Sequence, residues 1–455
     1  MSKRKALKNV RLSRVGPWLA PVLFVALLVA FSCTEAPQPA GERMAEPVAA
    51  HVPSLPDPNA TPSVTRYPKL IKWQGDAKPE APAGFEVSVY ADNLDNPRNL
   101  HLLPNGDLLV AEANTEPKPD EDPAKADGKK AAGAVGKSAN RVTLLRDANA
   151  DGKPELRTVF AAGIKQPFGM ALLGDRVYIA GTDTVWSYAY KAGATAVKAA
   201  GRQKIATLPA GGYNNHWTRN LIADRQQNKL YLSVGSASNV AEHGMEEERH
   251  RANILQMDPD GSNLRVYASG LRNPVGMDWN PATGKLWTVV NERDELGDEL
   301  VPDYLTSVQE NGFYGWPWFY IGNHRDPRLK GQRAELAKSV LVPDVLLGSH
   351  TATLGVAFSR GLPESAGKYR NGVFLAQHGS WNHSKFTGYR VAFIAFEDGK
   401  PASAAQDFLT GFLRSKESGE IYGRPTSIVT GLRGELFLAD DAGGRIWRVV
   451  HKDGN

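Results

Sequence analysis

The chain has 455 residues, of which 42% are hydrophobic and 23% are charged, and its formal net charge is +5. These values are ordinary for a globular protein, and the length allows one large domain such as a propeller. The region that follows the first segment contains no dense block of Lys and Arg, so we expect no nucleic-acid partner. The mild positive charge favours an anionic ligand or an acidic partner.

The first 33 residues have the pattern of an export signal. Six Lys and Arg residues between positions 3 and 14 precede a short apolar run from Trp18 to Phe31, which is too short for a typical transmembrane helix. The run ends at Cys33, the only cysteine of the chain, and a small residue before that Cys resembles a bacterial lipoprotein signal. We therefore expect a signal peptide over residues 1–33, a lipidated Cys33 and a periplasmic or cell-envelope location. The alternative is an ordinary cleaved signal.

Two segments lack apolar periodicity. Residues 34–75 are rich in Pro, Ala and Glu and are predicted to be a disordered linker. Residues 115–139 are rich in Lys, Asp, Ala and Gly and are predicted to be a flexible surface insertion. Residues 147–152, DANADG, resemble the start of a calcium loop, but Thr158 stands where an EF-hand requires Glu, so a tight Asp-Gly turn is favoured.

Residues 76–455 contain a repeated pattern of polar loop, short apolar strand, turn and second strand. It is clearest in GLRNPVGMDWNPATGKLWTVV, which starts at Gly270. Strands are favoured because the apolar runs are short, rich in Val and Trp, and bounded by Gly, Pro and Asn. The six copies begin near Leu94, Ile164, Asn220, Gly270, Leu354 and Tyr422. The sequence therefore predicts an all-β fold, a six-bladed β-propeller, with an irregular β-sandwich as the alternative.

The loops before and after the innermost strands carry the residues suited to chemistry. Loops at one end of a propeller gather around the central channel, so residues far apart in sequence can meet there. His216 is a candidate general base, and two arginines suit a planar ligand with several carboxylates. The carboxylate-rich loop after Asn291 could bind a hard cation through oxygen atoms. The candidates are His216, Arg272, Asn273, His350, His378, Arg424 and the loop ending at Asp298-Glu299.

Each candidate also has a structural interpretation. A lone loop histidine is more often a hydrogen-bonding partner than a catalyst, and Arg272 could simply pair with an Asp of a neighbouring blade. His378 and His383 are five residues apart, and the residues between them do not suggest a helix, so a zinc site is disfavoured. The sequence contains no Gly-x-Ser-x-Gly, P-loop or His-Glu-x-x-His motif.

Five motifs in order resemble the soluble quinoprotein sugar dehydrogenases, in particular the sorbosone and aldose sugar dehydrogenase branch. They are GLRNPVGMDW, NERDELGDEL, ENGFYGWPWFYIG, HGSWNHSKFTGYRV and YGRPTSIV. The resemblance covers residues 84–451. It implies a six-bladed propeller that binds pyrroloquinoline quinone (PQQ) and Ca²⁺ and oxidises aldoses or sorbosone-like hydroxy-aldehydes. It also implies an external electron acceptor, a cytochrome or a quinone.

The resemblance implies specific roles for matching positions. His216 would be the general base, Arg272 and Asn273 would hold the quinone, and Arg424 would pair with a PQQ carboxylate. The backbone carbonyls of Arg293 and Asp294 would bind Ca²⁺. Two departures affect the details: Ser236 replaces an Asp near the catalytic His, so that Asn239 or a water would orient the base, and the PQQ-facing Lys has no clear counterpart, Lys385 being only a candidate.

Two other functions stay open on the sequence. A calcium-dependent lactonase-like propeller hydrolase would use similar histidine and metal chemistry, but it has no need of the arginine pair. A non-catalytic propeller lipoprotein that binds a polymer or a partner protein would tolerate changes at His216 and Arg424. The sequence favours the PQQ- and Ca²⁺-dependent sugar dehydrogenase.

Overall fold

The computed structural model describes residues 52–118, 121–224 and 228–452. The expected signal peptide, Cys33 and the first part of the expected linker lie outside the described residues. No helix in the described part of the chain has the length and apolar character needed to cross a membrane.

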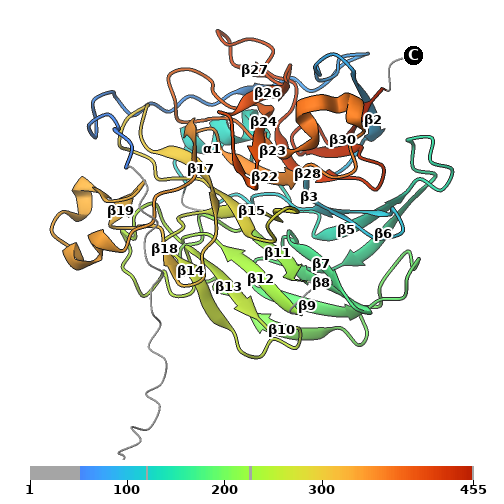
Figure 1. Ribbon diagram of the computed structural model, residues 1–455, viewed down its shortest axis with the longest axis horizontal. Coiled ribbons are helices and arrows are strands. Elements are labelled where there is room, and N and C mark those ends of the chain that lie inside the picture. Colours follow the sequence, from blue (N-terminus) through green and yellow to red (C-terminus); the bar gives the residue numbers. More distant parts are fainter. Residues whose placement is uncertain (1–51, 119–120, 225–227, 453–455) are drawn as a thin grey trace, which may run out of the picture. The chain divides into compact units, whose positions relative to one another are not determined.

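The described residues form a six-bladed β-propeller, as predicted (Figure 1). Each blade is an antiparallel sheet whose first strand is innermost, and the six inner strands contact one another in a closed ring. The inner strands are β3 (Pro97–Leu102), β7 (Met170–Leu173), β11 (Arg219–Asp224), β15 (Pro274–Trp279), β22 (Thr353–Phe358) and β28 (Pro425–Thr430). Buried hydrophobic clusters fill the spaces between neighbouring blades.

The first three blades continue outward from these inner strands, and the predicted surface insertion interrupts the first of them between its second and third strands. The first contains β4 (Leu108–Glu112), β5 (Arg141–Arg146) and β6 (Leu156–Ala162); the second contains β8 (Arg176–Ala180), β9 (Thr184–Ala189) and β10 (Gln203–Thr207); the third contains β12 (Lys229–Val234), β13 (Asn253–Met257) and β14 (Arg265–Ser269), with β18 (Gly312–Phe313) added in parallel. Short strands rich in Val, Leu, Ile and Tyr fit these half-buried and buried sheet positions.

The last three blades contain the remaining strands. The fourth contains β16 (Leu286–Val290), β17 (Pro302–Ser307) and β21 (Val345–Ser349), and the fifth contains β23 (Gly372–Gln377), β24 (Arg390–Glu397), β25 (Lys400–Pro401) and β26 (Gln406–Leu409). The connection between β17 and β21 of the fourth blade contains the β19 (Phe319–Tyr320) and β20 (His324–Arg325) hairpin and the 3₁₀ helices η1 (Pro327–Leu329) and η2 (Ala334–Lys338), and η3 (Glu364–Arg370) lies between β22 and β23 of the fifth blade. The sixth blade contains β29 (Leu436–Asp440) and β30 (Arg445–His451), and β2 (Phe85–Ala91) is its outer strand. Because β2 comes from the start of the domain, the two ends of the repeat region close the ring together.

The end of the predicted linker is ordered, which corrects the expected boundary at residue 75. From Val52 onward the segment packs on the propeller loops: Thr61 and Ser63 accept backbone hydrogen bonds from Asp298 and Gly297 at 2.9 and 3.0 Å. Further on, β1 (Lys69–Leu70) pairs in parallel with β27 (Glu420–Ile421). Composition predicted disorder because the segment has too few apolar residues to form a core of its own. In the folded protein, however, it is ordered by hydrogen bonds and packing contacts with the propeller. We call residues 52–74 the N-terminal strap.

The predicted surface insertion also contains regular structure. Its helix α1 (Pro123–Ala131) starts at Asp122, whose side chain caps the helix by accepting a hydrogen bond from Lys125 N. Tyr67 of the strap packs against Gly128, where an added Cβ would lie 2.1 Å from the Tyr67 ring. The insertion is therefore held by the strap, and the prediction of a flexible segment was wrong for the residues of this helix.

Candidate functional site

The predicted site residues lie at one end of the propeller. His216, Arg272 and Arg424 precede β11, β15 and β28, and the inner strands of a propeller all run in the same direction from this end. His216 and Asn273 are direct neighbours, because a Cβ on Gly235 would lie 2.6 Å from His216 Cβ and 2.3 Å from Asn273 Oδ1. The fold therefore brings together residues from separate blades, as the repeat pattern predicted.

The central channel is separate from this site. The inner strands line a cavity of about 1590 Å³ whose wall includes the distal ends of those strands, such as Leu173, Asp224 and Trp279. At the site end, five buried hydrophobic residues pack together across the axis: Ala113, Phe168, Trp217, Val275 and Leu354. These side chains form the floor beneath the site.

The hydrogen bonds of His216 define its tautomer. Nδ1 lies 2.8 Å from the Ser236 carbonyl oxygen, which can only accept, so Nδ1 carries the proton. Ser236 Oγ lies 3.0 Å from the same nitrogen and donates to Ser238 O at 2.6 Å. Nε2 is therefore the unprotonated nitrogen, which is the form a proton acceptor needs. Ser236 thus orients the histidine through both its carbonyl and its hydroxyl group.

Burial and charge keep His216 neutral. Burial, with a further contribution from the positive charge of Arg272, lowers its pKa to about 3. At neutral pH the imidazole can accept a proton but has none to donate from Nε2. This property suits a general base, although a base with so low a pKa in the ligand-free protein is weaker than one near 7.

A buried arginine holds the loop that carries His216. Arg219 donates hydrogen bonds to His216 O at 2.6 Å, Pro209 O at 2.7 Å and Asn214 Oδ1 at 2.9 Å. Burial lowers the pKa of Arg219 to about 9. A rigid guanidinium with several donors can fix three points of one loop at once. Sequence analysis missed this role because two of the partners are backbone carbonyl groups, which every residue type has.

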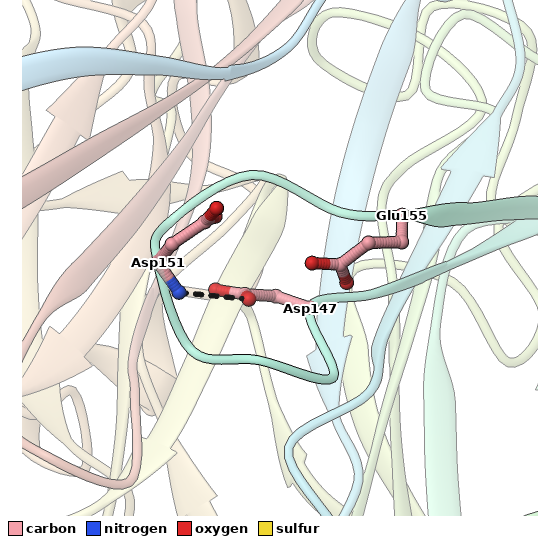
Figure 2. Close-up of side chains that lie close together, drawn as sticks. All are labelled: Asp147, Asp151 and Glu155. Atoms are coloured by element: carbon pink, nitrogen blue, oxygen red, sulfur yellow. Dashed lines mark hydrogen bonds between the residues drawn. The ribbon is translucent and has the colours of Figure 1, made fainter.

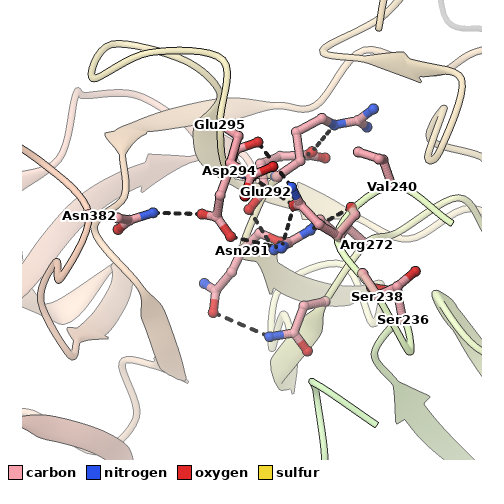
Figure 3. Close-up of polar contacts among 12 residues, drawn as sticks. Ser236, Ser238, Val240, Arg272, Asn291, Glu292, Asp294, Glu295 and Asn382 are labelled. Atoms are coloured by element: carbon pink, nitrogen blue, oxygen red, sulfur yellow. Dashed lines mark hydrogen bonds and ion pairs between the residues drawn. The ribbon is translucent and has the colours of Figure 1, made fainter. Parts of the chain in front are cut away.

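Arg272 joins the third and fourth blades. It donates to Glu292 O at 2.6 Å and to Asn239 Oδ1 at 2.9 Å, and its Nη2 lies 3.1 Å from Asp294 Oδ2 (Figure 3). Arg272 therefore pairs with Asp294, which follows β16 of the fourth blade, the blade that Arg272 itself precedes, and not with an Asp of a neighbouring blade as considered from sequence. That pairing also places its charge beside His216.

The Asp294 carboxylate is the centre of the polar network. Its Oδ1 accepts a hydrogen bond from Asn382 Nδ2 at 2.7 Å (Figure 3). Asn382 Nδ2 also lies 3.0 Å from His350 Nδ1. Burial alone would raise the pKa of Asp294, but Arg272 and His350 outweigh this effect and lower it to about 2. The carboxylate is therefore ionised at neutral pH. The prediction had assigned a role to the Asp294 backbone, whereas the structure makes its side chain the link between three loops.

The two predicted cation-binding carbonyls differ in availability. The Asp294 carbonyl accepts hydrogen bonds from Asn239 Nδ2 at 3.1 Å and Arg328 Nη1 at 3.0 Å. Two donors occupy both lone pairs of a carbonyl oxygen, so this one has none left for a cation. Among the described residues, no donor reaches the Arg293 carbonyl. The Arg293 side chain is structural: it is fully buried between Glu292 and Asp326 and donates to Pro317 O at 2.6 Å.

Arg424 is buried without a carboxylate partner. It donates to His378 O at 3.0 Å and Gly379 O at 2.8 Å, and in the described part of the chain no carboxylate oxygen lies within 4.0 Å of its guanidinium. The nearby Asp441 is already engaged by Arg98 and by His378 Nε2 at 3.0 Å. Burial lowers the pKa of Arg424, which is the expected response of a cation without a counter-ion.

A separate acidic cluster lies at the other end of the first blade. Oxygen atoms of Asp147, Asp151 and Glu155 lie within 4.8 Å of one another (Figure 2). Asp147 accepts hydrogen bonds from the backbone of Asp151 at 3.1 Å and of Gly152 at 2.8 Å, which makes a tight turn, as favoured from sequence. Since β5 starts at the site end and runs away from it, this turn is remote from His216.

Comparisons with known proteins agree with this architecture. The TrAA12-like family model matches residues 138–311 and 325–452. A calcium structure of the Trichoderma reesei carbohydrate-active enzyme family AA12 protein shares the fold, with a TM-score of 0.65, 19% identity, and coverage of 85% of this chain and 98% of that one.

Two curated relatives cover most of this chain. An uncharacterised protein of Borreliella burgdorferi is 26% identical over 82% of this chain and 91% of its own length. A pyrroloquinoline quinone-dependent pyranose dehydrogenase of Coprinopsis cinerea is 23% identical over 82% of this chain and 54% of its own length, so this chain spans about half of that enzyme. The predicted resemblance to quinoprotein sugar dehydrogenases is confirmed at the level of the family. On the extent of the family match, the chain belongs to the TrAA12-like family.

Proposed function

We propose that the protein is a PQQ-dependent dehydrogenase that oxidises a hydroxyl group, or a hydrated aldehyde, of an aldose or a sorbosone-like hydroxy-aldehyde. The observation that carries the proposal is the buried Arg424, which has no carboxylate partner among the described residues, at the same end of the propeller as a neutral, oriented His216. The pyranose dehydrogenase relative supports the cofactor and the substrate class.

The residues present fit a flat tricarboxylate. A buried guanidinium without a counter-ion is costly and gains most from an incoming carboxylate. Asn273 Oδ1 is also buried without a hydrogen-bond partner, although a buried amide oxygen is normally satisfied. Arg424 and Asn273, whose polar groups lack these partners, both lie on loops at the mouth of the site. When bound, PQQ would supply the two-electron acceptor for sugar oxidation.

We include Ca²⁺ in the proposal, with a modified set of ligands. Among the residues that the structure describes, no donor reaches the Arg293 carbonyl, and the buried Glu292 Oε1 has no hydrogen-bond partner. These hard oxygens suit Ca²⁺. The Asp294 carbonyl would first have to lose the hydrogen bond from Asn239 or from Arg328.

This chain's residues would then handle the proton and the substrate. His216 Nε2 would accept the hydroxyl proton, while its Nδ1–H remains bonded to Ser236. Arg272 and Asp294 would hold the surrounding loops in place, and the buried residues beneath the site would keep water away from it. Electrons would leave to an external cytochrome or quinone. The N-terminal pattern supports an extracytoplasmic location with a lipid anchor at Cys33 as part of the same proposal.

A spectral titration with PQQ and Ca²⁺, followed by an aldose and a dye acceptor, tests the proposal. We expect saturable PQQ binding that is weakened roughly 10²–10⁴-fold in Arg424→Met, because removing one partner of a buried ion pair costs about 3–5 kcal/mol. Arg433→Met, which changes an exposed arginine of the same blade, is the control and should bind like the parent. No PQQ binding by the folded protein in the presence of Ca²⁺ would reject the proposal and leave a lactonase or a binding propeller.

A further inference from the structure

Two aromatic side chains are exposed to solvent at the site end of the propeller. Tyr213 is 50% exposed and Trp381 is 36% exposed, and the other large hydrophobic side chains exposed in the described residues are aliphatic. Tyr213 precedes His216 by three residues, and Trp381 is followed directly by Asn382, which bonds to Asp294. Among the described residues, the exposed Tyr and Trp side chains therefore lie on two loops at the site end.

A stacked neighbour holds each ring in place. Tyr213 stacks on His243 with the ring centroids 3.3 Å apart and the planes 3° from parallel. Trp381 stacks on Tyr67 of the N-terminal strap at 5.8 Å and 11°. One face of each ring is covered, so the other face is available as a flat surface with a fixed orientation.

The strap anchors the Trp381 loop firmly. Arg66 N donates to Trp381 O at 2.7 Å, and the Arg66 guanidinium donates to Ser384 O at 2.7 Å and Glu417 O at 2.6 Å. The guanidinium also lies 4.3 Å from the centroid of the Phe386 ring. A platform that is ordered before binding loses less conformational entropy when a ligand binds. Strap residues that composition had predicted to be disordered therefore hold the Trp381 loop in position.

Polar side chains accompany the aromatic rings. Asn215 lies beside Tyr213 and is hydrogen-bonded by Lys118 of the insertion, and the Glu247 carboxylate lies against Gly212. Rings that offer a flat apolar face, with amides and charged groups at their edges, match the chemistry of a pyranose. Such a sugar has a face of axial C–H groups and an equatorial belt of hydroxyls. A small ketone or a hydrophobic ligand would not use the polar edge.

We infer that Trp381 and Tyr213 are stacking platforms for the non-reacting sugar units of an oligosaccharide whose terminal unit is oxidised beside His216. This inference rests on the proposed function and extends it, because it names the substrate as an oligosaccharide rather than a free monosaccharide. A gluco-configured chain with equatorial linkages presents C–H faces on every unit. Cello-oligosaccharides are therefore the probes of choice.

The test compares binding and turnover of glucose, cellobiose, cellotriose and cellotetraose. Binding is measured by calorimetry without an electron acceptor, and turnover is measured with PQQ, Ca²⁺ and a dye. We expect cellotetraose to bind at least about tenfold more tightly than glucose, and Trp381→Ala and Tyr213→Ala each to remove about tenfold of the tetraose affinity while leaving glucose binding unchanged. Trp381→Phe should retain most of the affinity. Leu432→Ala, at an exposed apolar residue on a different loop, is the matched control and should behave like the parent.

The outcomes separate this inference from the proposed function. If PQQ binds and glucose reduces it, but longer chains gain nothing and the variants bind like the parent, the platforms are disproved and the dehydrogenase stands. If Trp381→Ala weakens PQQ binding instead of tetraose binding, the ring belongs to the cofactor site and the inference fails. If PQQ does not bind but cellotetraose binds and loses affinity in both ring variants, the stacking role of the two rings is supported and the proposed dehydrogenase function is rejected.

Discussion

The neutral state of His216 can be tested through protein stability, independently of any cofactor. The histidine pKa falls from 6.5 to about 3 on folding. Between these two values the unfolded chain binds a proton that the folded protein does not, so the free energy of unfolding decreases as the pH is lowered from 6.5. At pH 4.5 the loss from this one group is about 2.7 kcal/mol, since two pH units at about 1.36 kcal/mol per unit separate it from 6.5.

Replacing His216 with Gln removes this term. We expect the parent to lose about 2.7 kcal/mol more stability than His216→Gln between pH 7 and 4.5, measured by urea unfolding at both pH values. Other titrating groups, among them Asp303 and Asp440 with pKa values raised to about 6, contribute equally to both proteins and cancel in the difference.

A neighbouring substitution controls for loop damage. Asn215→Gln changes an exposed residue of the same loop without adding or removing a titrating group, so it should keep the parent's pH dependence. Equal losses of stability in the parent and His216→Gln would refute the argument, because they would show that His216 is protonated with similar ease in the folded and unfolded chains. The histidine would then lack the neutral form that the proposed base requires.

Three further predictions concern the active protein. The acid limb of kcat/KM should not show an apparent pKa near 6.5 from His216, and His216→Ala should lower kcat by roughly 10²–10⁴-fold; a variant with nearly unchanged kcat would remove His216 from the role of base. Arg219→Lys should lower kcat, while PQQ affinity in the spectral titration stays within about twofold, because one ammonium cannot replace a guanidinium that holds three points of the loop; equal loss of both would assign Arg219 to the fold in general. Asp294→Asn should raise the Ca²⁺ concentration needed for half-maximal activity by at least about tenfold, because the network loses its negative charge; an unchanged Ca²⁺ requirement would place the cation elsewhere.

The local sequence was sufficient to determine the propeller. Short runs rich in Val, Trp and Leu between Gly, Pro and Asn define strands and turns by local geometry alone, and six repeats of that unit permit few closed arrangements. The same repeat placed His216, Arg272 and Arg424 before inner strands, which is why their meeting at one end was predictable. Their individual roles in catalysis and cofactor binding stay predictions.

The tertiary structure decided which neighbours complete the site. Arg219 acts on carbonyl groups, and any residue type supplies a carbonyl, so no motif could have revealed it. The side chain of Asp294 links Arg272, His350 and Asn382, which come from three separate loops. The carbonyl of that same residue, a predicted cation ligand, accepts hydrogen bonds from the Asn239 and Arg328 side chains, which no sequence motif indicated.

The N-terminal strap is the clearest case in which amino-acid composition led to a wrong structural prediction. Residues 52–74 have no apolar period of their own, and a chain that cannot bury apolar surface by itself is predicted to be disordered. The propeller loops supply what the segment lacks: a strand edge at Glu420–Ile421 for Lys69–Leu70, and an indole face on Trp381 for Tyr67. The sequence by itself therefore determined the repeating scaffold, because strand and turn preferences are local. Only the tertiary structure decided how the strap, the insertion and the loops surround the site, because their ordering depends on partners that lie from tens to hundreds of residues away in the sequence.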